Sequence, residues 1–210
     1  EVYFQNKNIF QVMIQKEFKT TPEYVVLNID EEISLIPVNK SVLPSVIEAY
    51  NEDPESALSA LPWLTTDKEI RQQIRDMLFD VESQRGSDKI HFWSIIHGDN
   101  NEFVGLIGLG DELQILHSNY NLGYWIRRQF RRQGIAIQCA STILEWLEQR
   151  QEFFRIEITV HPHNLAGLAT AASICQRWNG EQIDEFIGIE IGNRTVPHRI
   201  HIVDIRGDND

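Results

Sequence analysis

Hydrophobic residues along this chain switch repeatedly between the spacing of a helix and the spacing of a strand, which limits the folds it can adopt. Some segments repeat apolar residues every three or four positions, and others alternate them or group them in short runs. In chain order they predict a strand, two helices, three strands, a helix, a strand, a helix and two strands. With no internal repeat and no linker rich in Gly, Pro or Ser, this order predicts one α/β (α+β) domain. We expect a mixed central sheet of about seven strands flanked by about four helices.

The boundaries of these elements follow from turn and capping residues. Ser41 is the expected cap of the first helix, and Thr66 and Glu69 form a candidate capping box for the second. The remaining predicted elements are strands at 33–38, 90–97, 103–109, 122–126, 155–160, about 182–191 and 199–205, and helices at 134–150 and 165–178. Residues 1–28 are predicted to be an N-terminal extension, which includes a short helix around residues 9–14, and residues 29–210 the folded domain.

Charge is distributed unevenly over the chain, whose formal net charge is −12. Residues 1–120 carry 9 basic and 20 acidic side chains, whereas residues 121–210 carry 10 and 11. An acidic first half disfavours nucleic acid and would attract a cationic partner, although acidity also serves solubility alone. No segment approaches the roughly 18 apolar residues of a membrane span, and no signal peptide is visible, so we expect a cytoplasmic protein. Cys139 and Cys175 are expected in the core, and no metal site is predicted.

Four arginines interrupt this acidic background where a predicted strand passes directly into a predicted helix. Arg127, Arg128, Arg131 and Arg132 lie within six residues, and Gly134 follows at the start of the helix. The first turn of a helix offers unpaired N–H groups and a partial positive charge, and a glycine lets the backbone approach a ligand closely. This arrangement predicts an anion site of the kind that holds a pyrophosphate.

These residues resemble a known motif. Arg131-x-x-Gly134-x-Ala136 is similar to the acyl-CoA pyrophosphate motif, Gln/Arg-x-x-Gly-x-Gly/Ala, of the general N-acetyltransferase (GNAT) superfamily. The segment at 122–126, Leu-Gly-Tyr-Trp-Ile, resembles the family's central strand, and the segment at 160–164, Val-His-Pro-His-Asn, resembles its Val-x-Pro-x-Asn junction. Leu-Pro-Trp-Leu at 61–64 resembles the RimJ/RimL-type branch, which acetylates the N-termini of ribosomal proteins. The resemblance covers about residues 32–205.

The resemblance implies transfer of an acetyl group from acetyl-CoA to a primary amine by direct attack in a ternary complex. The central strand would separate from the next strand, so that its backbone near Trp125 and Ile126 pairs with the pantetheine arm of the cofactor. A backbone N–H would stabilise the oxyanion. The expected cofactor-binding residues are Trp125, Ile126, Arg127, Arg131, Arg132, Gln133, Gly134, Ile135, Ala136 and Asn164. Trp63 and Asn121 are the expected substrate-binding residues, with core or rim packing as the alternative for Trp63.

The attacking amine must lose a proton, so the reaction needs a base. Glu157 and His161 are the catalytic candidates, because both share one face of the strand at 155–160 and its continuation. The alternatives are a surface or salt-bridged Glu157 and a His161 that only shapes its loop. Two positions depart from the family pattern. Asn121 stands where relatives often carry Glu, and Gly167 stands where they often carry Ser, a candidate acid for the departing thiolate.

These observations predict an acetyl-CoA-dependent N-acetyltransferase whose acceptor is the N-terminus of a ribosomal or other basic protein. Two alternatives stay open, a polyamine or aminoglycoside acetyltransferase and a non-catalytic acyl-CoA-binding module. A nucleic-acid binder is disfavoured because no aromatic residues interleave the arginines and the net charge is negative. We expect no direct contact with nucleic acid or membrane, and the N-terminal extension and final hairpin are compatible with a homodimer.

Overall fold

The computed structural model describes residues 25–84, 86–98, 100–110, 114–150, 152–191 and 194–207. The short helix expected near residues 9–14 lies outside these ranges. The helices are η1 (Lys40–Val42), α2 (Leu43–Glu52), α3 (Pro54–Ala60), α4 (Ile70–Ser83), η2 (Arg128–Phe130), α5 (Ile135–Glu148) and α6 (Leu165–Arg177). The strands are β1 (Leu27–Asn28), β2 (Ile33–Pro37), β3 (His91–His97), β4 (Glu102–Gly110), β5 (Tyr120–Ile126), β6 (Phe153–Val160), β7 (Glu181–Gln182), β8 (Ile187–Ile191) and β9 (Arg194–Arg206).

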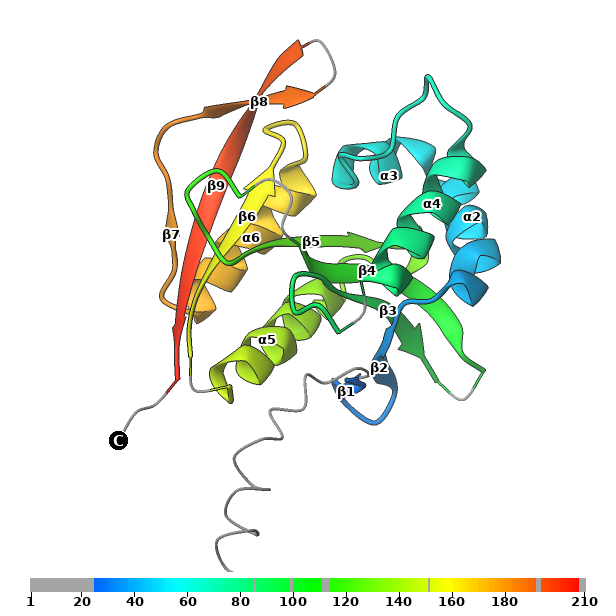
Figure 1. Ribbon diagram of the computed structural model, residues 1–210, viewed down its shortest axis with the longest axis horizontal. Helices are drawn as coiled ribbons and strands as arrows, with labels where there is room; N and C mark the ends of the chain where they lie inside the picture. The colour runs from blue at the N-terminus through cyan, green and yellow to red at the C-terminus, as the bar shows by residue number, and fades with distance from the viewer. Residues whose placement is uncertain are drawn as a thin grey trace, which may run out of the picture.

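The strands form one mixed sheet, as the alternating sequence pattern predicts (Figure 1). Its order is β1-β2-β3-β4-β5-β6-β9-β7, and β8 lies off this path and pairs with β9. Every pair is antiparallel except β5 with β6, which run parallel because helix α5 connects them. The sheet therefore changes character at its centre, between β5 and β6.

Helices cover both faces of the sheet (Figure 1). Helices α5 and α6 pack on one face over a large buried cluster that includes Ile143, Leu144 and Ile156. Helices α2, α3 and α4 pack on the other face over a second cluster. The neighbouring residues Leu106 and Ile107 of β4 belong to different clusters, as expected where successive side chains of a strand point to opposite faces. Cys139 and Cys175 are both free thiols in the core, as predicted.

The predicted helix caps are wrong. Asn39 caps the first helical segment by accepting a hydrogen bond from the N–H of Ser41, so Ser41 is the capped residue. Glu69 is itself the N-cap of α4 and accepts from the N–H groups of Arg71 and Gln72, which replaces the expected capping box. Both errors arise because several neighbouring polar residues can cap, and packing of the helix selects among them.

Three further segments differ from the sequence prediction. Helix α3 was not expected, since the segment after Pro54 carries only seven helical residues and a weak pattern. At the other end, β9 begins at Arg194, five residues earlier than predicted, although Pro197 lacks the N–H that a strand normally uses. The segment predicted as one strand at about 182–191 is divided into β7 and β8.

Among the described residues, no helix combines the length and apolar character needed to cross a membrane.

Candidate functional site

The central strands β5 and β6 separate soon after they meet. Their ladder contains two residue pairs, Tyr120 with Ile156 and Asn121 with Glu157. β5 then continues to Ile126 in register with β4 alone, while β6 continues in register with β9. The side-chain amide of Asn121 donates to Oγ1 of Thr159 at 2.8 Å, at the point where the strands part. The separation leaves one edge of β5 beyond Asn121 without a paired strand in the described structure.

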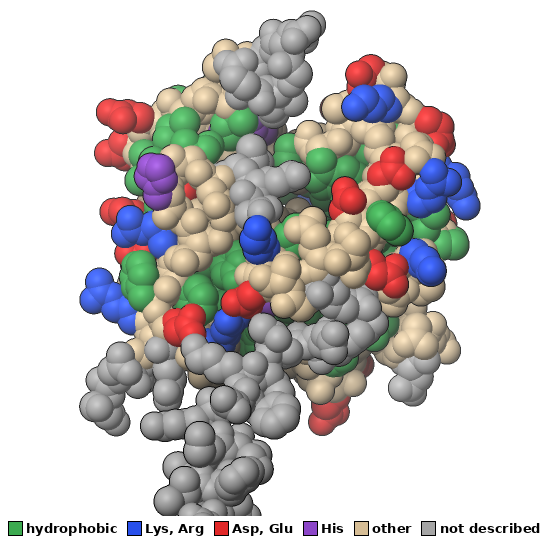
Figure 2. All heavy atoms as spheres, viewed as in Figure 1, with side chains coloured by type: hydrophobic (Ala, Val, Ile, Leu, Met, Phe, Trp, Pro, Cys, Tyr) green, Lys and Arg blue, Asp and Glu red, His purple; other side chains and the backbone are tan. Residues whose placement is uncertain are grey.

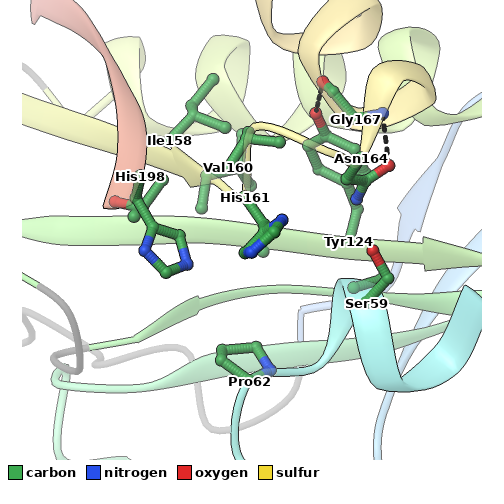
Figure 3. Close-up of a pocket in the computed structure, with 13 residues that line it drawn as sticks. Ser59, Pro62, Tyr124, Ile158, Val160, His161, Asn164, Gly167 and His198 are labelled. Atoms are coloured by element: carbon green, nitrogen blue, oxygen red, sulfur yellow. Dashed lines mark hydrogen bonds between the residues drawn. The ribbon is translucent and has the colours of Figure 1, made fainter. Parts of the chain in front are cut away.

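A pocket occupies this separation (Figure 3). Its walls come from β5, from β6 and the turn that follows it, from the end of α3 and from β9. The lining residues are Ser59, Ala60, Pro62, Leu122, Gly123, Tyr124, Ile158, Thr159, Val160, His161, Asn164, Gly167 and His198. Because two strands that normally pair have been parted, the pocket exposes backbone as well as side chains.

The loop between β5 and α5 has the geometry of an anion site. Arg132 and Gly134 both adopt positive φ values, 61° and 77°, and turns of this kind gather backbone N–H groups into a concave surface. Gly134 is the N-cap of α5, and no described side chain caps this helix, as is also the case for α2, whereas Asp53, Glu69 and Asn164 cap α3, α4 and α6. The free N–H groups of the first turn and the helix dipole favour a bound anion.

The predicted cofactor residues of this loop differ in what they present. Arg132, Gln133 and Gly134 are exposed, Ile135 is buried and Ala136 is half-buried. The side chain of Gln133 donates to the backbone oxygen of Gln129 at 3.1 Å. The exposed guanidinium of Arg132 and the backbone of residues 134–136 are therefore the parts of the loop that a ligand in solution can meet.

Arg127 and Arg131 instead bind carboxylates at the junction of α2 and α3. Nε of Arg127 lies 3.0 Å from both carboxylate oxygens of Glu52, and one of its terminal nitrogens lies 2.7 Å from Glu48. This pairing lowers the pKa of Glu52 and raises that of Arg127. Arg131 donates to Asp53 at 2.6 Å and to the backbone oxygen of Ile126 at 2.8 Å, and it lowers the pKa of Asp53. Their role at the cofactor stays a prediction, and an anion would compete with these carboxylates for Arg127.

The start of α6 forms the far side of the pocket. Asn164 caps the helix, with its side-chain oxygen accepting from the N–H of Gly167 at 2.8 Å, so its amide nitrogen is left to face a ligand. A Cβ at Gly167 would lie 2.7 Å from Asn164 and 2.9 Å from Val160, which explains why a residue as small as glycine stands here. Tyr124 reaches across from β5 and donates its hydroxyl to the backbone oxygen of Gly167 at 3.1 Å (Figure 3). Burial raises the pKa of the Tyr124 phenol, so Tyr124 stays protonated.

Glu157 is fully buried, and no other described residue forms a salt bridge with it. Its two carboxylate oxygens accept the backbone N–H groups of Ile115 and Leu116 at 2.8 and 2.6 Å. These bonds hold the segment before β5 against β6, and Glu157 is not among the residues that line the pocket. The catalytic role of Glu157 stays a prediction. Its hydrogen bonds to Ile115 and Leu116 also give it a structural role.

His161 does line the pocket, directly after the end of β6. Its Nδ1 accepts the backbone N–H of His163 at 3.1 Å, which also shapes the turn into α6. Burial, with smaller contributions from His198 and His163, lowers its pKa, so the ring is neutral at neutral pH.

The other predicted residues lie around these walls. Trp63 packs half-buried against the cluster under α2 to α4, and its neighbour Pro62 lines the pocket. The side chain of Trp125 is buried in that same cluster. Only its backbone, at the open edge of β5, is therefore available to a ligand. Ile126 packs against the cluster on the opposite face, and its backbone oxygen is the acceptor for Arg131.

Sequence reasoning missed Ser59, Tyr124 and His198 as pocket residues. Ser59 lies on the unexpected helix α3, and His198 lies in the part of β9 that Pro197 had hidden from the strand pattern. Tyr124 lies in the predicted central strand, where no sequence signal indicates that its side chain lines the pocket.

The chain was compared with known proteins. A family model described as acetyltransferase (GNAT) domain matches residues 32–174. No curated protein matches the sequence.

Solved structures share the fold at low identity. An acetyltransferase from Salmonella typhimurium that modifies the N-terminal serine of ribosomal protein L7/L12 superposes with a TM-score of 0.69 at 15% identity, covering 88% of this chain and 100% of its own. RimL in complex with coenzyme A gives 0.69 at 14%, covering 88% and 100%. The microcin C7 self-immunity acetyltransferase MccE, bound to acetyl-CoA and AMP, gives 0.67 at 13%, covering 84% and 94%.

Proposed function

Since the chain belongs to the acetyltransferase (GNAT) domain family, we propose that it transfers an acetyl group from acetyl-CoA to a primary amine by direct attack in a ternary complex. Membership of this family makes the chain an N-acetyltransferase, and the proposal concerns its donor, its acceptor and the residues that act. One observation carries it: the open edge of β5 beyond Asn121 lies next to the uncapped start of α5. A long ligand with an anionic end and a hydrogen-bonding arm fits that combination.

The loop from Arg131 to Ala136 suits the pyrophosphate of the donor. The left-handed residues Arg132 and Gly134, the uncapped helix start and the exposed Arg132 guanidinium all favour an anion. A Cβ built on Gly134 meets no atom within 4 Å, so the space above this backbone is open to a ligand. RimL and MccE, which share the fold, were solved with coenzyme A and acetyl-CoA respectively.

The open edge of β5 suits the pantetheine arm. Backbone N–H and C=O groups near Trp125 and Ile126 would pair with its amides in place of the missing strand, and the amide nitrogen of Asn164 faces the same pocket. A backbone N–H beside the thioester would stabilise negative charge on its oxygen during attack. The family resemblance and the separated strands support this placement together.

The reaction itself needs few parts. The amine nitrogen forms a bond to the thioester carbon, the C–S bond breaks with its electron pair leaving on sulfur, and the nitrogen loses a proton to a base. Primary amines are mostly protonated at neutral pH, so the acceptor must first become neutral. The pocket is lined by His161 and His198 and by the Tyr124 hydroxyl, all close to the separated strands.

For the acceptor we propose the N-terminus of a ribosomal or other basic protein. The support is the resemblance at residues 61–64, the acidic first half of the chain and the substrates named for the Salmonella and Vibrio fischeri structures of the same fold. On the face in Figure 2, acidic side chains over α3 and α4 lie among basic ones. A basic acceptor would therefore be attracted by scattered acidic residues and not by one acidic patch. A polyamine or aminoglycoside acceptor is the second candidate, and a non-catalytic acyl-CoA-binding module is the third.

Calorimetric titration with acetyl-CoA followed by a thiol-release assay tests the proposal. The acceptor panel holds peptides from ribosomal-protein N-termini, matched peptides with an acetylated N-terminus, polyamines and aminoglycosides. We expect binding, and thiol release that requires a free peptide N-terminus. Release with polyamines or aminoglycosides alone would replace the acceptor, binding without release for any amine would favour the acyl-CoA-binding module, and no binding would refute the proposed donor.

A further inference from the structure

Two histidines from different parts of the chain enter the pocket together. His161 follows β6 and His198 lies on β9, and both point toward the side formed by Pro62 (Figure 3). Their ring centroids are 5.5 Å apart and the rings are nearly perpendicular, at 87°. Either ring is a candidate for the base, and the hydrogen bonds that each already makes distinguish them.

The position of the proton on a neutral imidazole follows from its hydrogen bonds. Nδ1 of His161 lies 3.1 Å from the backbone nitrogen of His163 and accepts its hydrogen. The neutral ring therefore carries its own proton on Nε2. In that form His161 presents the Nε2–H donor to the pocket. Its lone pair, on Nδ1, already accepts the backbone N–H of His163.

The opposite holds for His198. Its Nδ1 lies 3.0 Å from the backbone oxygen of Val196, and a carbonyl oxygen only accepts, so Nδ1 carries the proton. The lone pair is then on Nε2, which makes no hydrogen bond to another described residue. His198 lines the pocket, so this nitrogen is available to a ligand there. His198 pairs with Ile187 in the ladder between β8 and β9 and the residue is only 5% exposed, so the ring is held in place.

We propose that Nε2 of His198 is the base that takes the proton from the attacking amine, while His161 offers an N–H donor to the pocket. The inference rests on the proposed acetyl transfer. As the N–C bond forms and the C–S electron pair leaves on sulfur, the amine proton passes to His198, whose Nδ1–H stays on Val196. The resulting imidazolium gives its proton to the departing thiolate or to water, which restores the starting ring.

The surroundings agree with this assignment. His161 is the titratable group that contacts His198 from the turn after β6, and His163 in turn contacts His161. On β9 itself, the guanidinium of Arg199 is turned toward the backbone oxygens of Ile183 and Asp184 and stacks over Phe186. Burial and, to a smaller extent, the neighbouring imidazoles lower the pKa of His161, which keeps it a neutral donor while His198 carries the transferred proton.

Paired asparagine substitutions test the proposal. In His198→Asn the amide nitrogen can still donate to the oxygen of Val196, but no basic lone pair remains. In His161→Asn the amide oxygen can still accept from His163, so the turn is kept. With acetyl-CoA and the best acceptor, we expect kcat of His198→Asn to fall about 10²- to 10⁴-fold, and kcat of His161→Asn to fall about 10-fold or less.

Three controls separate the outcomes. Acetyl-CoA affinity by calorimetry should be unchanged in both variants, and His198→Gln serves as a second variant if His198→Asn fails to fold. Added imidazole should restore part of the activity of His198→Ala and none of that of His161→Ala. If His198→Asn and His198→Gln keep kcat within 3-fold of an active parent, His198 is not the base, while an inactive parent would refute acetyl transfer itself.

Discussion

Replacing Glu157 by Gln removes a buried charge from a position where two backbone N–H groups point at it. The carboxylate is fully buried and accepts from Ile115 and Leu116 at 2.8 and 2.6 Å. A glutamine offers one oxygen, so one amide hydrogen would face an NH₂ group and lose its acceptor. A hydrogen bond to a charged group contributes about 1.5–3 kcal/mol, and an unsatisfied buried donor costs about 1–3 kcal/mol.

We therefore expect Glu157→Gln to lower the free energy of unfolding by about 3 kcal/mol, which for a chain of this length is a fall in Tm of about 6–12 °C. Urea unfolding followed by circular dichroism measures the change. Glu145 is an exposed glutamate on α5, so Glu145→Gln is a matched control and should stay within about 0.5 kcal/mol of the parent. A Glu157→Gln protein as stable as its parent would show that the two hydrogen bonds to Glu157 contribute no net stability. Kinetics at a temperature where it is folded would show whether Glu157 also acts as a base.

Three other changes are predicted from single contacts. Arg127→Met strips Glu52 of its partner and should cost about 1–3 kcal/mol of stability by urea unfolding, with part recovered in the double variant that adds Glu52→Gln. Gly167→Ser places a Cβ within 2.7 Å of Asn164 and should cost about 1–3 kcal/mol in the same assay while weakening acetyl-CoA binding in a titration. Burial lowers the pKa of His201, so the unfolded chain binds a proton at this residue more readily than the folded chain does. Stability should fall as the pH drops below about 6.5, by up to about 1.4 kcal/mol per pH unit for this group, and His201→Leu should reduce that slope in unfolding curves at pH 7.5 and 5.5.

Local patterns predicted most of the fold. The hairpin of β3 and β4, helices α5 and α6, and strands β5 and β6 follow from periodicity and from flanking Gly and Asn residues. Helix α3 has only about two turns, too few to distinguish it from a loop before the packing of Ala57 is known. The start of β9 could not be predicted, because the missing N–H of Pro197 argues against a strand at that position. Only the long ladders of β9 with β6 and β8 show that the strand includes it.

The candidate site divides in the same way. The loop at residues 131–136 could be recognised in sequence because strand, glycine and helix follow one another directly. The ion pairs of Arg127 and Arg131 could not be predicted from sequence, because their partners Glu52 and Asp53 lie more than seventy residues earlier in the chain. His198 reaches the pocket because of the register of β9 with its neighbouring strands. The local sequence around a residue does not show which distant strand it will pair with.

Titration of acetyl-CoA into the parent and into a charge-reversed loop variant measures whether the donor binds at the start of α5. Arg132→Glu reverses an exposed charge beside the uncapped start of α5, and Arg75→Glu makes the same change on α4, where the arginine side chain is 59% exposed. We predict that the parent binds acetyl-CoA, that Arg132→Glu binds at least about 10-fold more weakly, since that corresponds to about 1.4 kcal/mol, and that Arg75→Glu matches the parent. Equal affinity in all three proteins would contradict the placement of the donor at this loop, and no binding by the parent would contradict the proposed function.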